Sequence, residues 1–214
     1  MPEVQAKTAL IVGATGLVGS HLLSHLIESD RYQRIIVLAR RVESIKVHEK
    51  VIAKTFAALD RPAIEHVDDF YCALGTTQKV SGKAGLQVVD HHLVVRCAEW
   101  ARAAGANAAA VVSALGASVR SSFFYSRVKG EMEKDVEAIG FDSLMFWQPS
   151  VIYGARESSR PVEWLAARLL TVKCWGTYQS LPGEAVARAM AIQTPLAPNG
   201  IFRYNVGDIN SLLN

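Results

Sequence analysis

The sequence predicts an α/β fold: a doubly wound, mostly parallel sheet with a small C-terminal lobe. Two observations predict it. Short apolar runs alternate with helical patterns from the beginning of the chain, and a glycine-rich turn separates the first run from the first helical pattern. Buried strands separated by helices indicate a parallel sheet covered on both faces. Right-handed crossovers then place ligands at the carboxyl ends of the strands.

Strands are expected where apolar runs are short and bounded by turn residues. The runs lie at 8–12 (TALIV), 34–39 (RIIVLA), 50–53, 69–74 (DFYCAL), 108–114 (AAAVVSA), 143–154 (SLMFWQPSVIYG, halted by Pro149) and 201–206 (IFRYNV). Helical patterns fill the intervals at 17–27, 88–104, 126–139, 161–171 and 183–193. Gly105 and Gly140 follow two of these patterns and suit the turn that ends a helix. We predict one domain over 1–214, with a small substrate-loop region at 154–182.

Composition narrows the class of protein. The chain has 214 residues, of which 50% are hydrophobic and 20% charged, with a net charge of +3. These values are ordinary for a globular domain. The basic residues are spread along the chain, so no nucleic-acid partner is expected. Apolar stretches fall short of the ~18 residues of a membrane span, and no secretory signal is recognisable at the start, so we expect a cytoplasmic protein without a membrane partner.

Cysteines and histidines do not form a metal-binding pattern. Cys72, Cys97 and Cys174 are an odd number at wide spacings, which indicates neither a disulfide framework nor a zinc knuckle. His21 and His25 are four residues apart but lack a third ligand nearby, so we interpret them as residues of a helix surface. The cysteines are expected to be reduced and buried.

The turn after the first strand reads GATGLVG, with Gly13, Gly16 and Gly19 three residues apart. One glycine permits a tight turn, another lets backbone N–H groups approach a pyrophosphate, and the third lets helix and strand pack closely. The amino end of the following helix adds positive potential for the phosphates. The turn therefore predicts a dinucleotide site of the Rossmann type; a tight turn without a ligand is the alternative.

The second strand is followed by Arg40 and Arg41. An Asp or Glu at this point, about 20 residues beyond the loop, usually binds a free ribose 2′-hydroxyl. A guanidinium instead matches a 2′-phosphate with two parallel hydrogen bonds. We therefore favour NADP over NAD as the cofactor, with a solvated basic turn as the alternative.

A hydroxyl, a phenol and an ammonium are expected at one crevice. Ser113 lies at the end of the fifth strand, and Tyr125 and Lys129 lie one turn apart at the start of the next helix. Hydride transfer to a carbonyl requires a proton on the developing oxyanion, and a free phenol with a pKa of about 10 is a poor acid–base group at neutral pH. We expect Lys129 to lower that pKa and Ser113 to hold the substrate oxygen.

These motifs together resemble the short-chain dehydrogenase/reductase superfamily. The stretches CALGTTQ, VVSALGAS, FFYSRVKGEME and QPSVIYGARESSRPVEWL are similar, more narrowly, to its atypical branch of Tat-interacting tumour-suppressor oxidoreductases and related bacterial proteins. The resemblance covers nearly the whole chain. It implies an NADP-binding Rossmann fold with Ser113, Tyr125 and Lys129 in the catalytic positions, acting on a small carbonyl or alcohol substrate.

The loops at the carboxyl ends of the strands supply the expected cofactor-binding residues. We assign this role to Gly13, Thr15, Gly16, Leu17, Val18, Gly19, Arg40, Arg41, Leu74, Gly75, Thr76, Lys129, Pro149 and Val151.

The sequence departs from the superfamily at two points. Many members have an Asn in the helix after the fourth strand that completes a proton relay, whereas this chain reads VVDHHLVV, so Asp90 or His91 serves there or the relay is altered. ALGTT replaces the usual Asn-Ala-Gly, and Thr76 and Thr77 either touch the cofactor or cap the turn. The atypical branch also includes proteins better known for partner binding than for turnover.

Three functions follow, in descending order of preference. The first is an NADP-dependent oxidoreductase, and the second is a dinucleotide-binding regulatory or partner-binding protein with little activity. A nucleotide-sugar epimerase or dehydratase ranks last, because only about sixty residues follow Tyr153. The substrate pocket is expected from loops around 76–85 and 154–180, where Arg156, Ser159 and Arg160 either bind an acidic group or remain solvated. A homodimer through 88–104 and 126–139 is left open.

Overall fold

A single parallel sheet organises the chain. The computed structural model describes residues 7–61, 65–154 and 179–214. The strand order of the main sheet is β3-β2-β1-β4-β5-β6-β9, and all neighbouring strands in it run parallel. The predicted doubly wound α/β fold is therefore confirmed. The strands are β1 (Lys7–Val12), β2 (Tyr32–Ala39), β3 (Val51–Thr55), β4 (Asp69–Cys72), β5 (Ala108–Val112), β6 (Ser143–Trp147) and β9 (Gly200–Tyr204).

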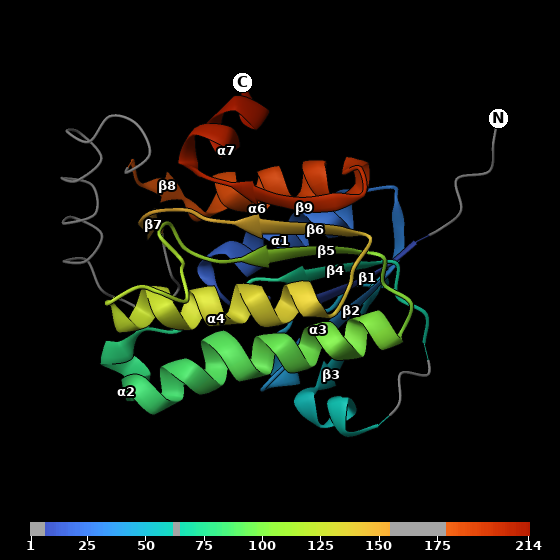
Figure 1. The fold of residues 1–214 in the computed structure, drawn as a ribbon. Helices are drawn as coiled ribbons and strands as arrows, with labels where there is room; N and C mark the ends of the chain where they lie inside the picture. Colours follow the sequence, from blue (N-terminus) through green and yellow to red (C-terminus); the bar gives the residue numbers. More distant parts are fainter. Residues whose placement is uncertain (1–6, 62–64, 155–178) are drawn as a thin grey trace.

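Helices cover both faces of this sheet (Figure 1). One face carries α2 (Gln78–Gln87), α3 (Leu93–Ala103) and α4 (Phe124–Ala138), and the other carries α1 (Leu17–Glu28) and α6 (Gly183–Gln193), with α7 (Val206–Leu213) beside α6. Burial separates into two apolar clusters, one on each face. Because successive side chains of a strand point to opposite faces, Leu10 and Val12 join one cluster while Ala9 and Ile11 join the other. Strands buried on both sides explain the continuous apolar runs of the sequence.

Several elements differ from the sequence prediction. The helix expected at 88–104 begins earlier, at Gln78, and includes a π-helical turn, η3 (Val88–His92), between α2 and α3. Part of the expected pocket loop at 76–85 is therefore helical. Two glycines hide the pattern there, and Gly82 interrupts the helix with a positive φ of 69°. The expected helix at 161–171 lies outside the described residues.

The C-terminal part of the chain adds short elements that the sequence patterns did not indicate. The apolar run at 143–154 divides into β6 and a two-residue strand, β7 (Ile152–Tyr153), which pairs with β8 (Leu181–Pro182). The last helix, α7, begins with a capping box in which Asn205 and Asp208 exchange side-chain and backbone hydrogen bonds. Its few residues carry too short a pattern for a period to be recognised.

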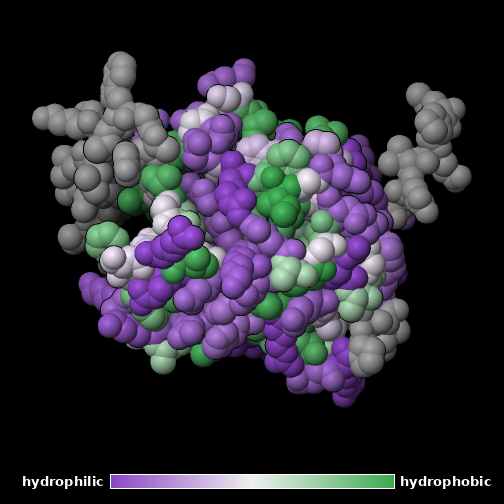
Figure 2. Space-filling view, viewed as in Figure 1, coloured by the Kyte–Doolittle hydropathy of each residue, from purple (hydrophilic) through white to green (hydrophobic). Residues whose placement is uncertain are grey.

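The outer surface over α2, α3 and α4 is predominantly hydrophilic, with apolar residues scattered among polar ones (Figure 2). No helix in the described parts of the chain is long and apolar enough to cross a membrane. A homodimer through α3 and α4 stays a prediction.

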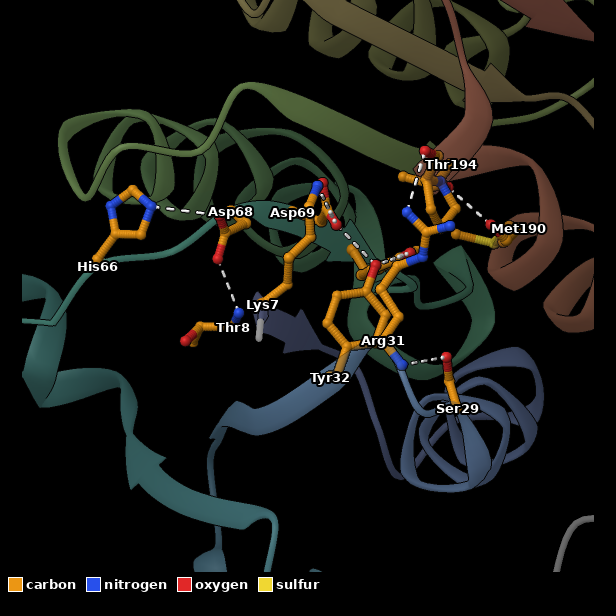
Figure 3. Close-up of polar contacts among 12 residues, drawn as sticks. Lys7, Thr8, Ser29, Arg31, Tyr32, His66, Asp68, Asp69, Met190 and Thr194 are labelled. Atoms are coloured by element: carbon orange, nitrogen blue, oxygen red, sulfur yellow. Dashed lines mark hydrogen bonds and ion pairs between the residues drawn. The ribbon is translucent and has the colours of Figure 1, made fainter. Parts of the chain in front are cut away.

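The amino ends of β1, β2 and β4 meet in a buried polar cluster, shown in Figure 3. The Tyr32 hydroxyl donates to Asp69 Oδ2 at 2.7 Å and lies 2.8 Å from the Tyr71 hydroxyl. Lys7 Nζ reaches the same Asp69 oxygen at 3.5 Å. Burial is the main cause that raises the pKa of both tyrosines above the ordinary value, so both stay protonated and serve as hydrogen-bond donors. The cluster joins the amino ends of three strands, whereas the glycine turn lies at their carboxyl ends.

Substitution of Tyr32 tests how much this cluster stabilises the fold. Among the described residues, Tyr32→Phe leaves the buried Asp69 carboxylate with the Lys7 ammonium, at 3.5 Å, as its one side-chain partner. We expect a loss of about 1.5–3 kcal/mol in the free energy of unfolding, because the lost hydrogen bond is to a charged group. Tyr71→Phe is the matched control: it removes hydrogen bonds with the hydroxyls of Tyr32 and Thr194 but none to a charged group, so it should cost less than Tyr32→Phe. Urea unfolding of both variants measures the difference; equal losses would contradict the assignment.

Candidate functional site

The glycine turn packs against the carboxyl end of β4. Gly13 has a φ of 82°, and a β-carbon added there would lie 2.5 Å from the carbonyl carbon and oxygen of Ala73. A β-carbon on Gly19 would lie 2.0 Å from the Gly13 oxygen, so helix and turn also meet at a distance that only glycine permits. Gly16 N donates to Gly13 O at 2.9 Å and closes the turn. The turn thus has the close backbone approach that a pyrophosphate site requires.

The two arginines predicted to select the cofactor follow β2. Both Arg40 and Arg41 are exposed, and neither side chain forms an ion pair within the described residues. The end of β2 lies beside the glycine turn, because β1 and β2 are paired along their length. A guanidinium here is therefore available to an anionic group bound at the turn.

A buried ion pair lies beside the carboxyl ends of β4 and β5. Lys129 on α4 is 2% exposed, and its Nζ lies 2.9 Å from Asp90 Oδ1. Asp90 is fully buried on the π-helical turn η3, and its second oxygen accepts the backbone N–H of Thr76 at 2.8 Å. Lys129 Nζ also donates to the Val112 carbonyl at the end of β5, at 3.3 Å. The pair therefore connects the loop after β4 with the end of β5.

The charges in this pair reinforce each other. Burial alone would disfavour the Lys129 ammonium, but the charge and hydrogen bond of Asp90 outweigh it and raise the pKa of Lys129. Lys129 therefore stays a cation at neutral pH. Insertion of one extra residue into a helix, as in η3, is frequent at functional sites because it changes the direction in which a side chain points. Asp90 is the acidic residue that the VVDHHLVV stretch offered in place of the relay Asn.

The phenol of Tyr125 lies one helical turn before Lys129. Tyr125 is 41% exposed, and its hydroxyl makes no hydrogen bond within the described residues. The expectation that Lys129 brings its pKa toward neutrality is wrong for this structure. Desolvation raises the pKa of Tyr125, Lys129 lowers it, and Asp90 raises it again, so the net shift is upward. Burial of Tyr125 is the largest of these causes and was not foreseen from the sequence, and Asp90 opposes the ammonium as well.

Ser113 follows β5 as expected but has a different hydrogen-bond partner from the one predicted. Its side chain is buried, and Oγ donates to Glu133 Oε1 at 2.5 Å. Glu133 lies one turn beyond Lys129 on α4 and is only 4% exposed. Ser113, Tyr125 and Lys129 are thus brought to one region at the carboxyl end of β5, yet the serine hydroxyl is bound to a carboxylate that the sequence analysis did not name.

The remaining predicted cofactor residues lie around the same strand ends. Leu74, Gly75 and Thr76 form the loop after β4, next to Gly13 and Asp90. The Pro149 carbonyl accepts Leu115 N at 3.0 Å, and the Val151 carbonyl accepts Leu181 N at 3.0 Å. Thr15, Leu17 and Val18 complete the turn and the start of α1.

The other sequence candidates are two groups, the cysteines and the residues of the loop after Tyr153. Cys72 and Cys97 are free and buried as expected, while Cys174 lies outside the described residues. Residues 7–61, 65–154 and 179–214 contain no group of three side chains arranged to hold a metal ion. The loop residues Arg156, Ser159 and Arg160 lie outside the described residues.

Fold and site together define a dinucleotide-binding α/β protein. The chain belongs to the NAD dependent epimerase/dehydratase family, whose model matches residues 9–176. Among curated proteins, rat Protein HTATIP2 is 34% identical over 198 residues, covering 88% of this chain and 81% of its own length. Protein fmp52, mitochondrial, from Aspergillus clavatus is 38% identical over 173 residues, covering 74% of this chain and 71% of its own. The branch inferred from the sequence motifs is confirmed.

Solved structures confirm the fold. MoeE5 in complex with UDP-glucose and NAD superposes with a TM-score of 0.69 at 15% identity, over 95% of this chain and 80% of MoeE5. The oxidoreductase ylbE from Lactococcus lactis superposes with a TM-score of 0.64 at 18% identity, over 96% of each chain.

Paired substitutions test the Asp90–Lys129 ion pair. Asp90→Asn leaves a buried ammonium without its counter-charge, and we expect a loss of about 3–5 kcal/mol in the free energy of unfolding. Lys129→Met should cost a similar amount, because it leaves the buried Asp90 carboxylate without its counter-charge, with only the Thr76 N–H as a partner among the described residues. The double variant removes both charges and should cost clearly less than the sum of the single losses. Losses that simply add in urea unfolding would show that the two charges do not stabilise each other.

Proposed function

We propose that this chain is an NADP-dependent oxidoreductase that interconverts a small carbonyl compound and the corresponding alcohol, with Tyr125 as the acid–base residue. The single observation that carries the proposal is the accessible phenol of Tyr125 one turn from the buried Lys129–Asp90 pair, on the helix that follows β5. The nearby glycine turn fits the backbone of a dinucleotide. Membership of the NAD dependent epimerase/dehydratase family supports this class of cofactor.

The bound nicotinamide would supply or accept the hydride, and the residues of this chain handle the proton. In reduction, the Tyr125 hydroxyl donates its proton to the substrate oxygen as negative charge develops there. The upward shift of its pKa keeps the phenol protonated at neutral pH, so a proton is present to be donated, and it also makes the phenol a weaker acid than one tuned to neutral pH. Lys129 then stabilises the phenolate that remains. Asp90 keeps the lysine charged and fixes its position.

A regulatory dinucleotide-binding protein is the second candidate. One observation favours it: Lys129 and Ser113 already have partners inside the protein, Asp90 and Glu133. The names of the relatives do not decide between an enzyme and a regulatory protein.

We still expect a cytoplasmic location, although the names of the fungal relatives include the word mitochondrial.

Substitution of Tyr125 separates these two functions. We expect Tyr125→Phe to lower kcat for carbonyl reduction by about 10²–10⁴, the usual contribution of general acid catalysis, with the Kd for NADPH nearly unchanged. Tyr153→Phe, a tyrosine on β7, is the control. The measurement is NADPH oxidation across a panel of aldehydes and ketones. Undiminished turnover in Tyr125→Phe would remove the acid–base assignment, and a panel without any reduction above the enzyme-free rate would favour the regulatory function.

Cofactor choice is tested at Arg40. If its guanidinium binds the 2′-phosphate, NADPH binds more tightly than NADH, and Arg40→Ala reduces the gap by roughly ten- to a hundredfold. Arg34→Ala removes another exposed arginine, which lies on β2 itself, and should leave the gap unchanged. Fluorescence titration gives the four affinities. Equal affinity of the parent protein for NADPH and NADH would overturn the preference for NADP.

A further inference from the structure

Glu133 collects hydrogen bonds from three separate parts of the chain. Its Oε1 accepts Ser113 Oγ at 2.5 Å and Gln148 Nε2 at 2.8 Å, and its Oε2 accepts Arg203 Nε at 3.1 Å. Ser113 directly follows β5, Gln148 directly follows β6, and Arg203 lies on β9. A buried carboxylate with three donors around it is an acceptor for all of them. The proton of the Ser113 hydroxyl is therefore committed to Glu133.

The geometry assigns to Glu133 the role of a positioning residue that turns Ser113 into a hydrogen-bond acceptor toward the substrate. This inference rests on the proposed function. A serine hydroxyl has one proton and two lone pairs. Once the proton points at Glu133, only lone pairs remain for a ligand at the end of β5. Such an oxygen binds a substrate O–H group and gives nothing to a bare carbonyl oxygen.

The substrate class follows from this restriction. Tyr125 is the donor for the reacting oxygen, so the group that Ser113 binds is a second polar group that donates a hydrogen bond. A carbonyl compound with a hydroxyl next to the reacting carbon meets both requirements. We therefore expect an α-hydroxy carbonyl compound, or the diol formed from it, to be preferred to its analogue without the hydroxyl.

The replacement of Glu133 by glutamine should reverse the polarity of Ser113. Arg203 can only donate and lies at the Oε2 position, so the single amide oxygen of the glutamine takes that position. The NH₂ group then takes the Oε1 position, where it donates to Ser113 Oγ, and Gln148 can turn its own amide oxygen toward it. The serine proton thereby becomes free for the substrate. A general loss of stability would not produce this change, because it would affect both kinds of substrate alike.

The test compares two pairs of probes that differ only in the hydroxyl: glycolaldehyde with acetaldehyde, and 2-hydroxyacetophenone with acetophenone, each reduced with NADPH. We expect the parent protein to prefer the hydroxylated member by about tenfold or more in kcat/KM, the effect of one hydrogen bond to a polarised group. Glu133→Gln should bring that ratio close to one or invert it. Its Kd for NADPH should remain that of the parent protein.

Glu137→Gln is the matched control, because Glu137 lies on the same helix and contacts Arg203 as well. It should keep the parental ratio. Ser113→Ala should lose the preference while Glu133 retains its other two donors, and it decides the question if Glu133→Gln does not fold in a thermal melt. A parental ratio near one, an unchanged ratio in Glu133→Gln, or a retained preference in Ser113→Ala would overturn the inference. Absence of reduction of every probe despite bound NADPH would instead contradict the proposed function, and the inference with it.

Discussion

The Lys129–Asp90 ion pair is the constraint on which the arrangement of the site depends. Two opposite charges removed from water are stable only if each is held at close range and its remaining polar atoms are satisfied. Asp90 meets this condition with the ammonium and the Thr76 N–H, and Lys129 meets it with Asp90 and the Val112 carbonyl. The loop after β4, the π-helical turn and the start of α4 are thereby fixed relative to the end of β5.

Along α4, polar side chains recur at intervals of four residues and reach different depths. Tyr125 is accessible, whereas Lys129 and Glu133 are buried. Lys129 pairs with Asp90, and Glu133 accepts a hydrogen bond from Ser113. The lysine and the glutamate therefore do not pair with one another. At the amino ends of the strands, Tyr32 and Asp69 form a separate polar cluster. These two buried polar groups thus lie at opposite ends of the strands, and the two apolar clusters cover the faces of the sheet.

The fold was predictable because its signals are local. The apolar runs, the glycine turn and the terminating Gly105 and Gly140 each depend on neighbouring residues, and Gly105 and Gly140 indeed have positive φ values. The α2 helix was not predicted, because Gly82 and Gly85 disguise its period. The spacing of four residues between Tyr125 and Lys129 correctly predicted that they lie one turn apart on one helix.

Partners that come from distant strands could not be predicted in the same way. The burial of Asp90 and its contact with Lys129 depend on the π-helical turn, which has no sequence signature. Glu133 carried a usable signal, since it continues the four-residue spacing of Tyr125 and Lys129. Its contact with Arg203 nevertheless depends on β9 lying beside β6, which only the sheet order reveals.

The internal partners of Lys129 and Ser113 support catalysis as much as regulation. A catalytic group is effective when its orientation is set before the substrate arrives, because no reorganisation is then required during the reaction. Lys129 has three N–H donors, of which Asp90 and Val112 take two. Ser113 keeps its lone pairs, and the Tyr125 hydroxyl makes no hydrogen bond within the described residues. Each group therefore keeps at least one hydrogen-bonding position for a ligand, a condition that the proposed active site must meet and that a purely structural network would not require.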